Sequence, residues 1–238
     1  MPTATEVRDW YNRHYAARGI AGMRPAAAYR LIIDLLDPRP GSALLDVSCG
    51  PGLLLAAAAE RGVTVTGVDL SDEAVRVARR AAPTARLAVG PGEHLSFRDS
   101  SFDYVTCLGS LEHFTDMRQG LREMRRVAKP GAQICVMVPN ARFIGWKLLG
   151  HKGTSQQDIN EALLGLHEWR TLLQETGLAV ERIVADRWHA MRWRRGAAGK
   201  GGWLLGAPLE LAWRLIPLRW QYQFVFLLRP RNTPPSAP

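Results

Sequence analysis

The sequence contains few cysteines and lacks any long apolar segment. Its 238 residues include three cysteines, Cys49, Cys107 and Cys135, with no C-x-x-C spacing between them, so we predict neither a metal site nor a redox motif. No run of about twenty apolar residues is present to span a bilayer, and the N-terminus lacks the charged-then-apolar pattern of a signal peptide. We therefore expect a cytoplasmic protein with reduced, buried cysteines and no transmembrane segment.

Two common nucleotide-binding motifs are also missing. No G-x-x-x-x-G-K-S/T segment occurs in the sequence, which excludes a P-loop for ATP or GTP. Gly50 and Gly52 are followed by Leu55 at the position where the dinucleotide fingerprint needs a third glycine, so a pyrophosphate would be poorly bound. The remaining form of this motif is an acidic residue followed by glycines.

The segment from Leu44 to Leu70 is the most informative part of the chain. It reads LLDVSCGPGLLLAAAAERGVTVTGVDL, which is an apolar strand, a glycine turn, an alanine-rich helix and a second strand. Gly50 and Gly52 carry no Cβ, so a bulky adenosine group can approach the backbone there. Asp69 ends the second strand, and its two carboxylate oxygens can accept hydrogen bonds from both ribose hydroxyls. This segment predicts half of a nucleoside-binding site.

The glycine turn resembles motif I of the class I S-adenosylmethionine-dependent methyltransferases, commonly D-x-G-x-G-x-G. DVSCGPG matches it, except that Ser48 replaces the first glycine. GPGEHLSFRDSSFDYVTCLGSLEHF, residues 90–114, and VAKPGAQICVMVPN, residues 127–140, resemble later segments of the family in the correct order, so the resemblance covers roughly residues 41–140. It implies an α/β, Rossmann-like, doubly wound sheet of seven mostly parallel strands. The antiparallel last strand is expected between strands five and six.

Hydrophobic periodicity and turn residues predict the individual elements. Helices are expected at 5–17 and 26–36, within the alanine-rich segment, after the Ser71 cap, and at 116–128, 167–176 and 203–216. Strands are expected at 43–47, up to Asp69, and at 86–89, 103–108, 132–138, 178–186 and 221–229. We expect one domain over residues 1–230, with an N-terminal helical lid at 1–40, a cofactor-binding core at 41–140 and a flexible tail at 231–238.

The formal net charge of +9 is concentrated in one informative cluster, RWHAMRWRRGAAGK at residues 187–200. Elsewhere, the excess of arginine over lysine and the abundance of alanine are compatible with GC-rich coding. The cluster opens a basic and apolar insertion at 187–219, before the last strand. Interleaved tryptophans and arginines could stack bases and hold phosphates, the apolar part could contact a lipid surface or cover an apolar pocket, or the insertion could simply pack on the last strands.

The resemblance implies a role for several residues in binding S-adenosylmethionine. Asp46 would hold the amino group of the cofactor, and Asp69 would bind its ribose. The family often has an acidic residue that binds the adenine amino group at about the position of Pro91, where the backbone of Gly92 and Glu93 would substitute. The other implied contacts are the turn from Ser48 through Cys49 and Gly50 to Gly52, Leu70 beside adenine, Leu108 and Gly109 beside the methionyl part, and Tyr11 and Tyr15 on the lid helix.

His113 is the predicted general base, since it follows the fourth strand, where the methyl acceptor must approach, and imidazole titrates near neutrality. The alternative is a structural histidine bonded to backbone. Glu112 and His113 also resemble the end of an E-x-x-E-H metal motif, but Gly109 stands at its first position. We therefore predict no metal.

The sequence favours a methyltransferase that moves a methyl group in line to oxygen, nitrogen or carbon of a small metabolite, with a lipophilic one as a specific alternative. LGSLEHF stands where a D/N-P-P-Y/F motif commonly grips nucleobases or glutamine amides, which makes nucleic acid a less favoured substrate. An RNA methyltransferase and a catalytically silent cofactor-binding scaffold remain open as alternatives. The attacking atom and the oligomeric state are not determined by the sequence.

Overall fold

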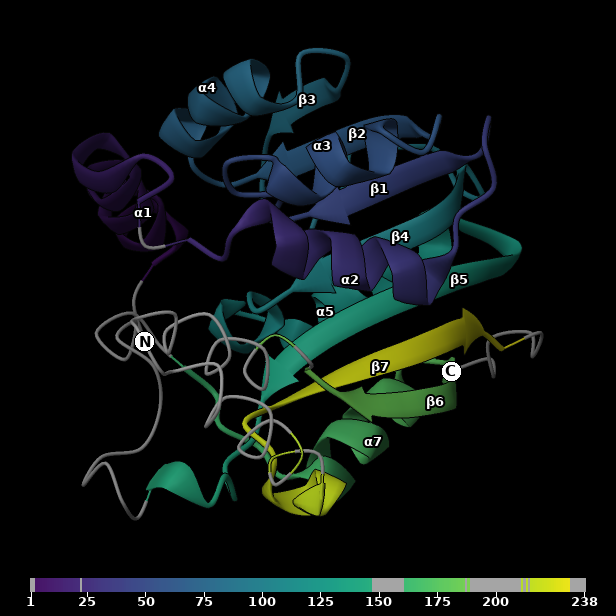
Figure 1. Cartoon of the computed structure of the whole chain (residues 1–238). Helices are drawn as coiled ribbons and strands as arrows, with labels where there is room; N and C mark the ends of the chain where they lie inside the picture. The colour runs from purple at the N-terminus through teal and green to yellow at the C-terminus, as the bar shows by residue number, and fades with distance from the viewer. Residues whose placement is uncertain are drawn as a thin grey trace.

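The computed structural model describes residues 3–21, 23–146, 161–186, 188, 211, 213 and 215–231. These residues build a seven-stranded sheet in the order β3-β2-β1-β4-β5-β7-β6 (Figure 1). The strands are β1 (Ala43–Val47), β2 (Thr64–Asp69), β3 (Arg86–Val89), β4 (Phe102–Leu108), β5 (Ala128–Pro139), β6 (Leu178–Ala185) and β7 (Gln223–Pro230). Strands β1 to β5 pair in parallel, and β7 pairs antiparallel with both β5 and β6. The predicted fold and the place of the last strand are confirmed.

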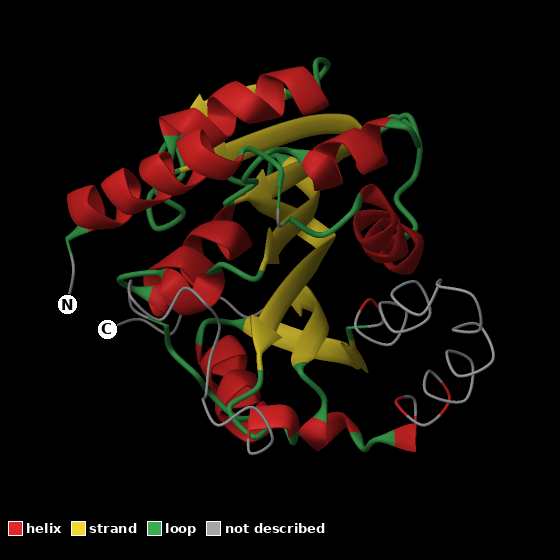
Figure 2. Ribbon diagram, turned by 60° about the vertical axis from the view of Figure 1, so that its left-hand side comes forward, coloured by secondary structure: helices red, strands yellow, loops and turns green. Residues whose placement is uncertain are grey.

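Helices cover both faces of the sheet (Figure 2). They are α1 (Ala4–Arg18), α2 (Ala26–Leu36), α3 (Leu53–Ala59), α4 (Asp72–Ala81), α5 (Met117–Val127) and α7 (Leu166–Glu175), with short 3-10 turns η1 (Leu111–His113) and η3 (Leu218–Trp220). On one face Leu121 and Trp169 pack against Val105, and on the other Ile33 and Leu55 pack in the cluster around β1. Because both faces are buried, the central strands are continuously apolar rather than alternating.

One boundary differs from the prediction. Lys129, Pro130 and Gly131 were expected to separate a helix from a strand beginning at 132, whereas β5 already begins at Ala128, which pairs with Phe102. The register shifts between Phe102 and Tyr104, so this start of β5 is irregular. Proline has no N–H to donate to a regular ladder and is tolerated at such irregularities.

Several sequence predictions lie wholly or mostly outside the described residues. The basic cluster, most of the expected helix at 203–216 and the tail after Arg231 belong to this part of the chain. The division into one domain with a lid and an insertion stays a prediction. In the described part of the chain, no helix combines the length and apolar character that crossing a bilayer would require.

Candidate active site

A cavity of about 250 Å³ lies at the carboxyl ends of the parallel strands, beside α1. Figure 1 shows α1 at the edge of the sheet toward which β1 points. The cavity brings together eight residues predicted for the site from regions far apart in the sequence. These are Tyr11, Tyr15, Ser48, Asp69, Leu70, Gly92, Glu93 and His113.

Asp69 is the best-anchored acidic group at this cavity. Its Oδ2 accepts the backbone N–H of Gly50 at 2.8 Å, and its Oδ1 accepts that of Ser71 at 2.9 Å. Each carboxylate oxygen has a further lone pair, so both can still accept a hydroxyl of a sugar. Burial raises the pKa of Asp69 to about 6, against the lowering effect of the two backbone hydrogen bonds.

The glycine turn adopts left-handed backbone conformations, with φ of +58° at Ser48, +50° at Gly50 and +75° at Gly52. The carbonyl of Val68 on β2 accepts the N–H of Cys49 at 3.0 Å, which joins the turn to the second strand. A Cβ built on Gly50 would lie 3.0 Å from the hydroxyl of Tyr15. The space beside Gly50 is therefore taken up by Tyr15 of the lid helix, and Gly50 itself does not line the cavity.

Gly52 and Cys49 belong to the turn for reasons of packing, and neither lines the cavity. A Cβ on Gly52 would lie 2.9 Å from that of Ala78, so this glycine allows α4 to approach the start of α3. The sequence-based reason for Gly52, space for the ligand, is thus replaced by space for a helix. Cys49 is buried, and burial raises the pKa of its thiol well above the usual range.

Asp46 lies behind the cavity wall rather than on it. It is 4% exposed, and its Oδ1 accepts the hydroxyl of Thr106 at 2.6 Å from the neighbouring strand β4. Burial raises the pKa of Asp46 to about 7, with the Thr106 hydrogen bond opposing and the nearby Asp69 charge adding to the rise. The carboxyl therefore exchanges a proton near neutrality and also joins β1 to β4.

The lid helix α1 is fixed to the protein directly beside Asp69. Asn12 accepts the hydroxyl of Ser71 at 2.6 Å and donates to Asp72 at 2.7 Å, both at the start of α4. Tyr11 stacks on Tyr15 with ring centroids 6.2 Å apart and meets the ring of His113 edge-on at 6.5 Å. Helix α1 thus places two aromatic rings over the cavity.

The loop after β3 forms the opposite wall. A Cβ on Gly92 would lie 2.4 Å from the ring of Phe114, so the absence of a side chain lets the loop pack on that ring. Glu93 accepts the backbone N–H of Thr115 at 2.9 Å and its hydroxyl at 3.0 Å. The side chain of Glu93 therefore fixes the loop to the segment after η1.

At the end of β4, Gly109 has a φ of +64° and donates its N–H to the carbonyl of Met137 at 2.8 Å. The following turn η1 is buried, with Glu112 2% and His113 5% exposed. His113 lines the cavity, as predicted for a residue near the reacting groups, whereas Leu108 and Gly109 lie beyond its lining. Within the described residues, no group of three or more histidine, cysteine or acidic side chains is arranged to hold a metal.

Sequence reasoning missed three polar residues near the carboxyl ends of the strands. Two of them, Asn12 and Arg24, were not singled out at all, and Glu112 was considered only as part of a metal motif. Arg24 forms an ion pair with Asp186 at 2.7 Å and also donates to Gln223, which joins the segment before α2 to β6 and β7. Asn12 lies one helical turn from Tyr15, on the side of the lid helix that faces the protein, and this spacing could have indicated it. Nothing local in the sequence indicates Arg24.

This arrangement defines a Rossmann-like protein with a nucleoside-cofactor site at the carboxyl ends of its strands. A family model described as "Methyltransferase domain" matches residues 45–136. The ubiquinone biosynthesis O-methyltransferase of Hahella chejuensis is 31% identical over 166 residues, covering 66% of this chain and 68% of that protein. The chain belongs to the class I S-adenosylmethionine-dependent methyltransferases, and its cofactor is S-adenosylmethionine.

Two further similarities show how much of the chain is matched in sequence and how much in fold. The nocamycin O-methyltransferase of Saccharothrix syringae is 38% identical over 133 residues, so the match spans 52% of this chain but only about half, 47%, of that protein. The crystal structure of the cyclase SpnF superposes with a TM-score of 0.68 at 18% identity, over 97% of each chain. The second similarity shows the fold alone.

The residues present fit S-adenosylmethionine. Asp69 offers two carboxylate oxygens at the cavity wall, and Ser48 of the glycine turn lines the same cavity. Leu70, Pro91 and Phe114 give the same cavity apolar walls suited to a purine ring.

Proposed function

We propose that this protein transfers the methyl group of S-adenosylmethionine to a hydroxyl of a small metabolite. The observation that carries the proposal is the gathering of Asp69, the lid tyrosines and His113 around one cavity. The choice of a small molecule and of oxygen is supported by the two relatives named as O-methyltransferases. The alternative of a lipophilic acceptor is supported by one of these relatives, which is named for ubiquinone biosynthesis.

Positioning carries most of the rate enhancement in this proposal. When bound, S-adenosylmethionine supplies a methyl group on a positively charged sulfur, which is already an excellent leaving group. Asp69 would hold the ribose, Asp46 would hold the amino group directly or through water, and Leu70 would flank the adenine. Oriented reactants gain roughly 7–11 kcal/mol over free encounter, so the site needs no covalent nucleophile.

For the acceptor proton, His113 is our proposed general base. It is buried at the cavity wall, opposite Tyr11, on the turn that follows β4. Its role is tested by the pH dependence of kcat in His113→Gln once an acceptor is known. A base role predicts loss of the acidic limb of the profile, whereas a structural histidine predicts an unchanged profile with lower stability.

The proposed function is tested by transfer of a labelled methyl group from S-adenosylmethionine to fractions of native extract. Label in a small organic-soluble or water-soluble product supports it. Label in RNA would instead support the RNA methyltransferase alternative, and that binding should weaken steeply with salt. Cofactor binding without transfer to any fraction would favour the silent scaffold.

A further inference from the structure

Glu112 is a buried carboxyl with unused hydrogen-bonding capacity, and it lies directly behind the cavity wall, between Ser110 and His113, which both line the cavity. It is 2% exposed, and its Oε2 has no hydrogen-bond partner. Its Oε1 lies 4.0 Å from the position that a Cβ on Gly109 would take, at the end of β4. A buried oxygen without a donor is costly, so its presence beside a ligand site points to a partner that arrives with the ligands.

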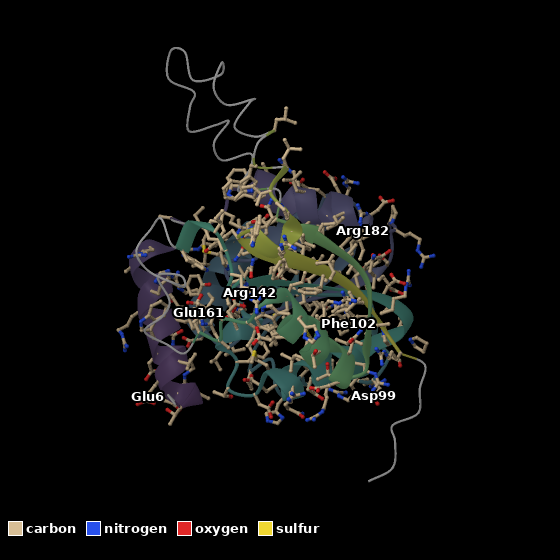
Figure 3. All side chains as sticks on the ribbon, turned by 90° about the horizontal axis from the view of Figure 1, so that it is seen from below. Glu6, Asp99, Phe102, Arg142, Glu161 and Arg182 are labelled. Carbon is tan, nitrogen blue, oxygen red and sulfur yellow. The ribbon has the colours of Figure 1, made fainter. Side chains whose placement is uncertain are left out.

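The charged and titratable groups around Glu112 offset little of the desolvation cost of its ionised form. The charge of Glu161 raises the pKa of Glu112, and that of Arg24 lowers it. The charge of Glu112 in turn raises the pKa values of Tyr11, Tyr222 and Cys107. His113 follows Glu112 in the chain. Arg24 is held by Asp186 and Gln223. In Figure 3, Glu161 lies on the side of the molecule occupied by α1, away from Phe102 at the start of β4. Burial raises the pKa of Glu112 to about 8.

We propose that Glu112 is a further acid–base residue of this site, protonated in the free protein and ionised when the sulfonium cofactor binds. The inference rests on the proposed function and on the family resemblance, which implies that Gly109, at the end of β4 just beyond the cavity lining, borders the methionyl part of S-adenosylmethionine. A nearby positive charge favours the ionised form of a carboxyl and typically lowers its pKa by about 1–3. Glu112 would therefore lose its proton to solvent as the cofactor enters.

The ionised carboxylate can then serve the transfer. The acceptor hydroxyl hydrogen-bonds to Glu112, its oxygen forms the new bond to the methyl carbon, and the carbon–sulfur bond breaks with its electron pair going to sulfur. The hydroxyl proton passes to the Glu112 carboxylate. Since the positive charge on sulfur disappears in the same step, the carboxylate becomes more basic as the acceptor loses its proton. The inference concerns Glu112 and holds whether or not His113 also exchanges a proton.

The test needs no knowledge of the acceptor. Binding of S-adenosylmethionine and of S-adenosylhomocysteine is measured by calorimetry at pH 7.5 in buffers of different ionisation enthalpy, which gives the protons released. The two ligands share their amino, carboxyl and nucleoside groups and differ in the charge on sulfur. A carboxyl with a pKa of about 8 is about three-quarters protonated at this pH. The charged ligand should therefore release up to about 0.7 proton more than the neutral one.

Variants assign the effect to one group. In Glu112→Gln the excess proton release should vanish while both ligands still bind, and it should persist in Glu175→Gln, a surface carboxylate paired with Arg118.

Equal proton release by the two ligands in the wild-type protein would overturn the role of Glu112 while leaving the proposed function intact. Excess release that survives in Glu112→Gln would also overturn it. If neither ligand binds, the proposed function itself fails. Equal release in the wild-type protein overturns the role even if Glu112→Gln does not fold.

Discussion

The two ends of this site hold their buried carboxyls differently. At the carboxyl end of β2, Asp69 accepts two backbone N–H groups within 3 Å. At the end of β4, Glu112 keeps one oxygen without any donor. The fold thus supplies hydrogen-bond donors to both oxygens of Asp69, which we assign to the cofactor. It leaves one oxygen of Glu112, which we assign to the acceptor, without a donor.

The pKa values follow the same order. Burial raises the pKa of all three carboxyls at this edge, to about 6 for Asp69, about 7 for Asp46 and about 8 for Glu112. Asp69 accepts two backbone donors and Asp46 accepts one hydroxyl, from Thr106. The second donor at Asp69 offsets more of the desolvation cost of the charged form than the single donor that Asp46 or Glu112 accepts, which for Glu112 is its own backbone N–H. The difference between the two ends is therefore electrostatic as well as geometric.

The largest effect on cofactor affinity is expected from the substitution of Asp69. Asp69→Ala takes away the acceptor for two backbone N–H groups and for the ribose, and hydrogen bonds to a charged group contribute about 1.5–3 kcal/mol each. We expect the Kd for S-adenosylmethionine to rise by about 100-fold or more, measured by calorimetry. Asp103→Asn is the control, since Asp103 pairs with Lys129 at the opposite edge of the sheet. Unchanged affinity in Asp69→Ala would contradict the site.

The pH dependence of the free energy of unfolding should reveal the raised pKa of Glu112. Because the pKa of Glu112 is raised on folding, the folded state retains this proton while the unfolded state loses it. Stability therefore falls between the unfolded value, near 4.5, and about pH 8. We expect Glu112→Gln to remove part of this fall, on the order of 3 kcal/mol between pH 5 and pH 8. Parallel pH curves of denaturant unfolding for the two proteins would contradict the prediction.

Two of the glycines with φ near +75°, Gly41 and Gly52, allow the effect of packing to be separated from that of backbone strain. Gly41, with φ +78°, has open space at its Cβ position, whereas Gly52, with φ +75°, faces Ala78 at 2.9 Å. Gly41→Ala should cost about 1–2 kcal/mol of stability from strain alone, and Gly52→Ala about 1–3 kcal/mol more because α4 must move. Chemical denaturation measures both, and equal losses would show that Gly52 is not needed for helix packing.

The smallest predicted effect is on the lid. Asn12→Ala removes the hydrogen bonds that join α1 to Ser71 and Asp72, worth about 1 kcal/mol. We expect the Kd for S-adenosylmethionine to rise about fivefold with little change in stability. Arg13→Ala, an exposed neighbour on the same helix, is the matched control. Equal affinity for the two variants would show that the lid contact does not contribute to binding.

How much the sequence predicts also differs between the two ends. The strand at 43–47 was predicted to the residue, and Asp69 was placed at the end of its strand, because strand, turn and helix follow one another within 30 residues and each has its own local pattern. Arg24 and Asp186 are 162 residues apart, so no pattern in one segment indicates their ion pair. Glu112 was considered only as part of a metal motif, since its isolation from donors depends on chain packing. The residues that we assign to the cofactor are local in sequence, and the packing around the residue that we assign to the acceptor is not.

The central claim is that the cavity beside Asp69 binds a sulfonium nucleoside. Calorimetric titration of the protein with S-adenosylmethionine, with NAD as the competing cofactor class, tests it most directly. The account predicts one S-adenosylmethionine bound per chain and no binding of NAD in the same range. Tight binding of NAD without binding of S-adenosylmethionine would contradict it.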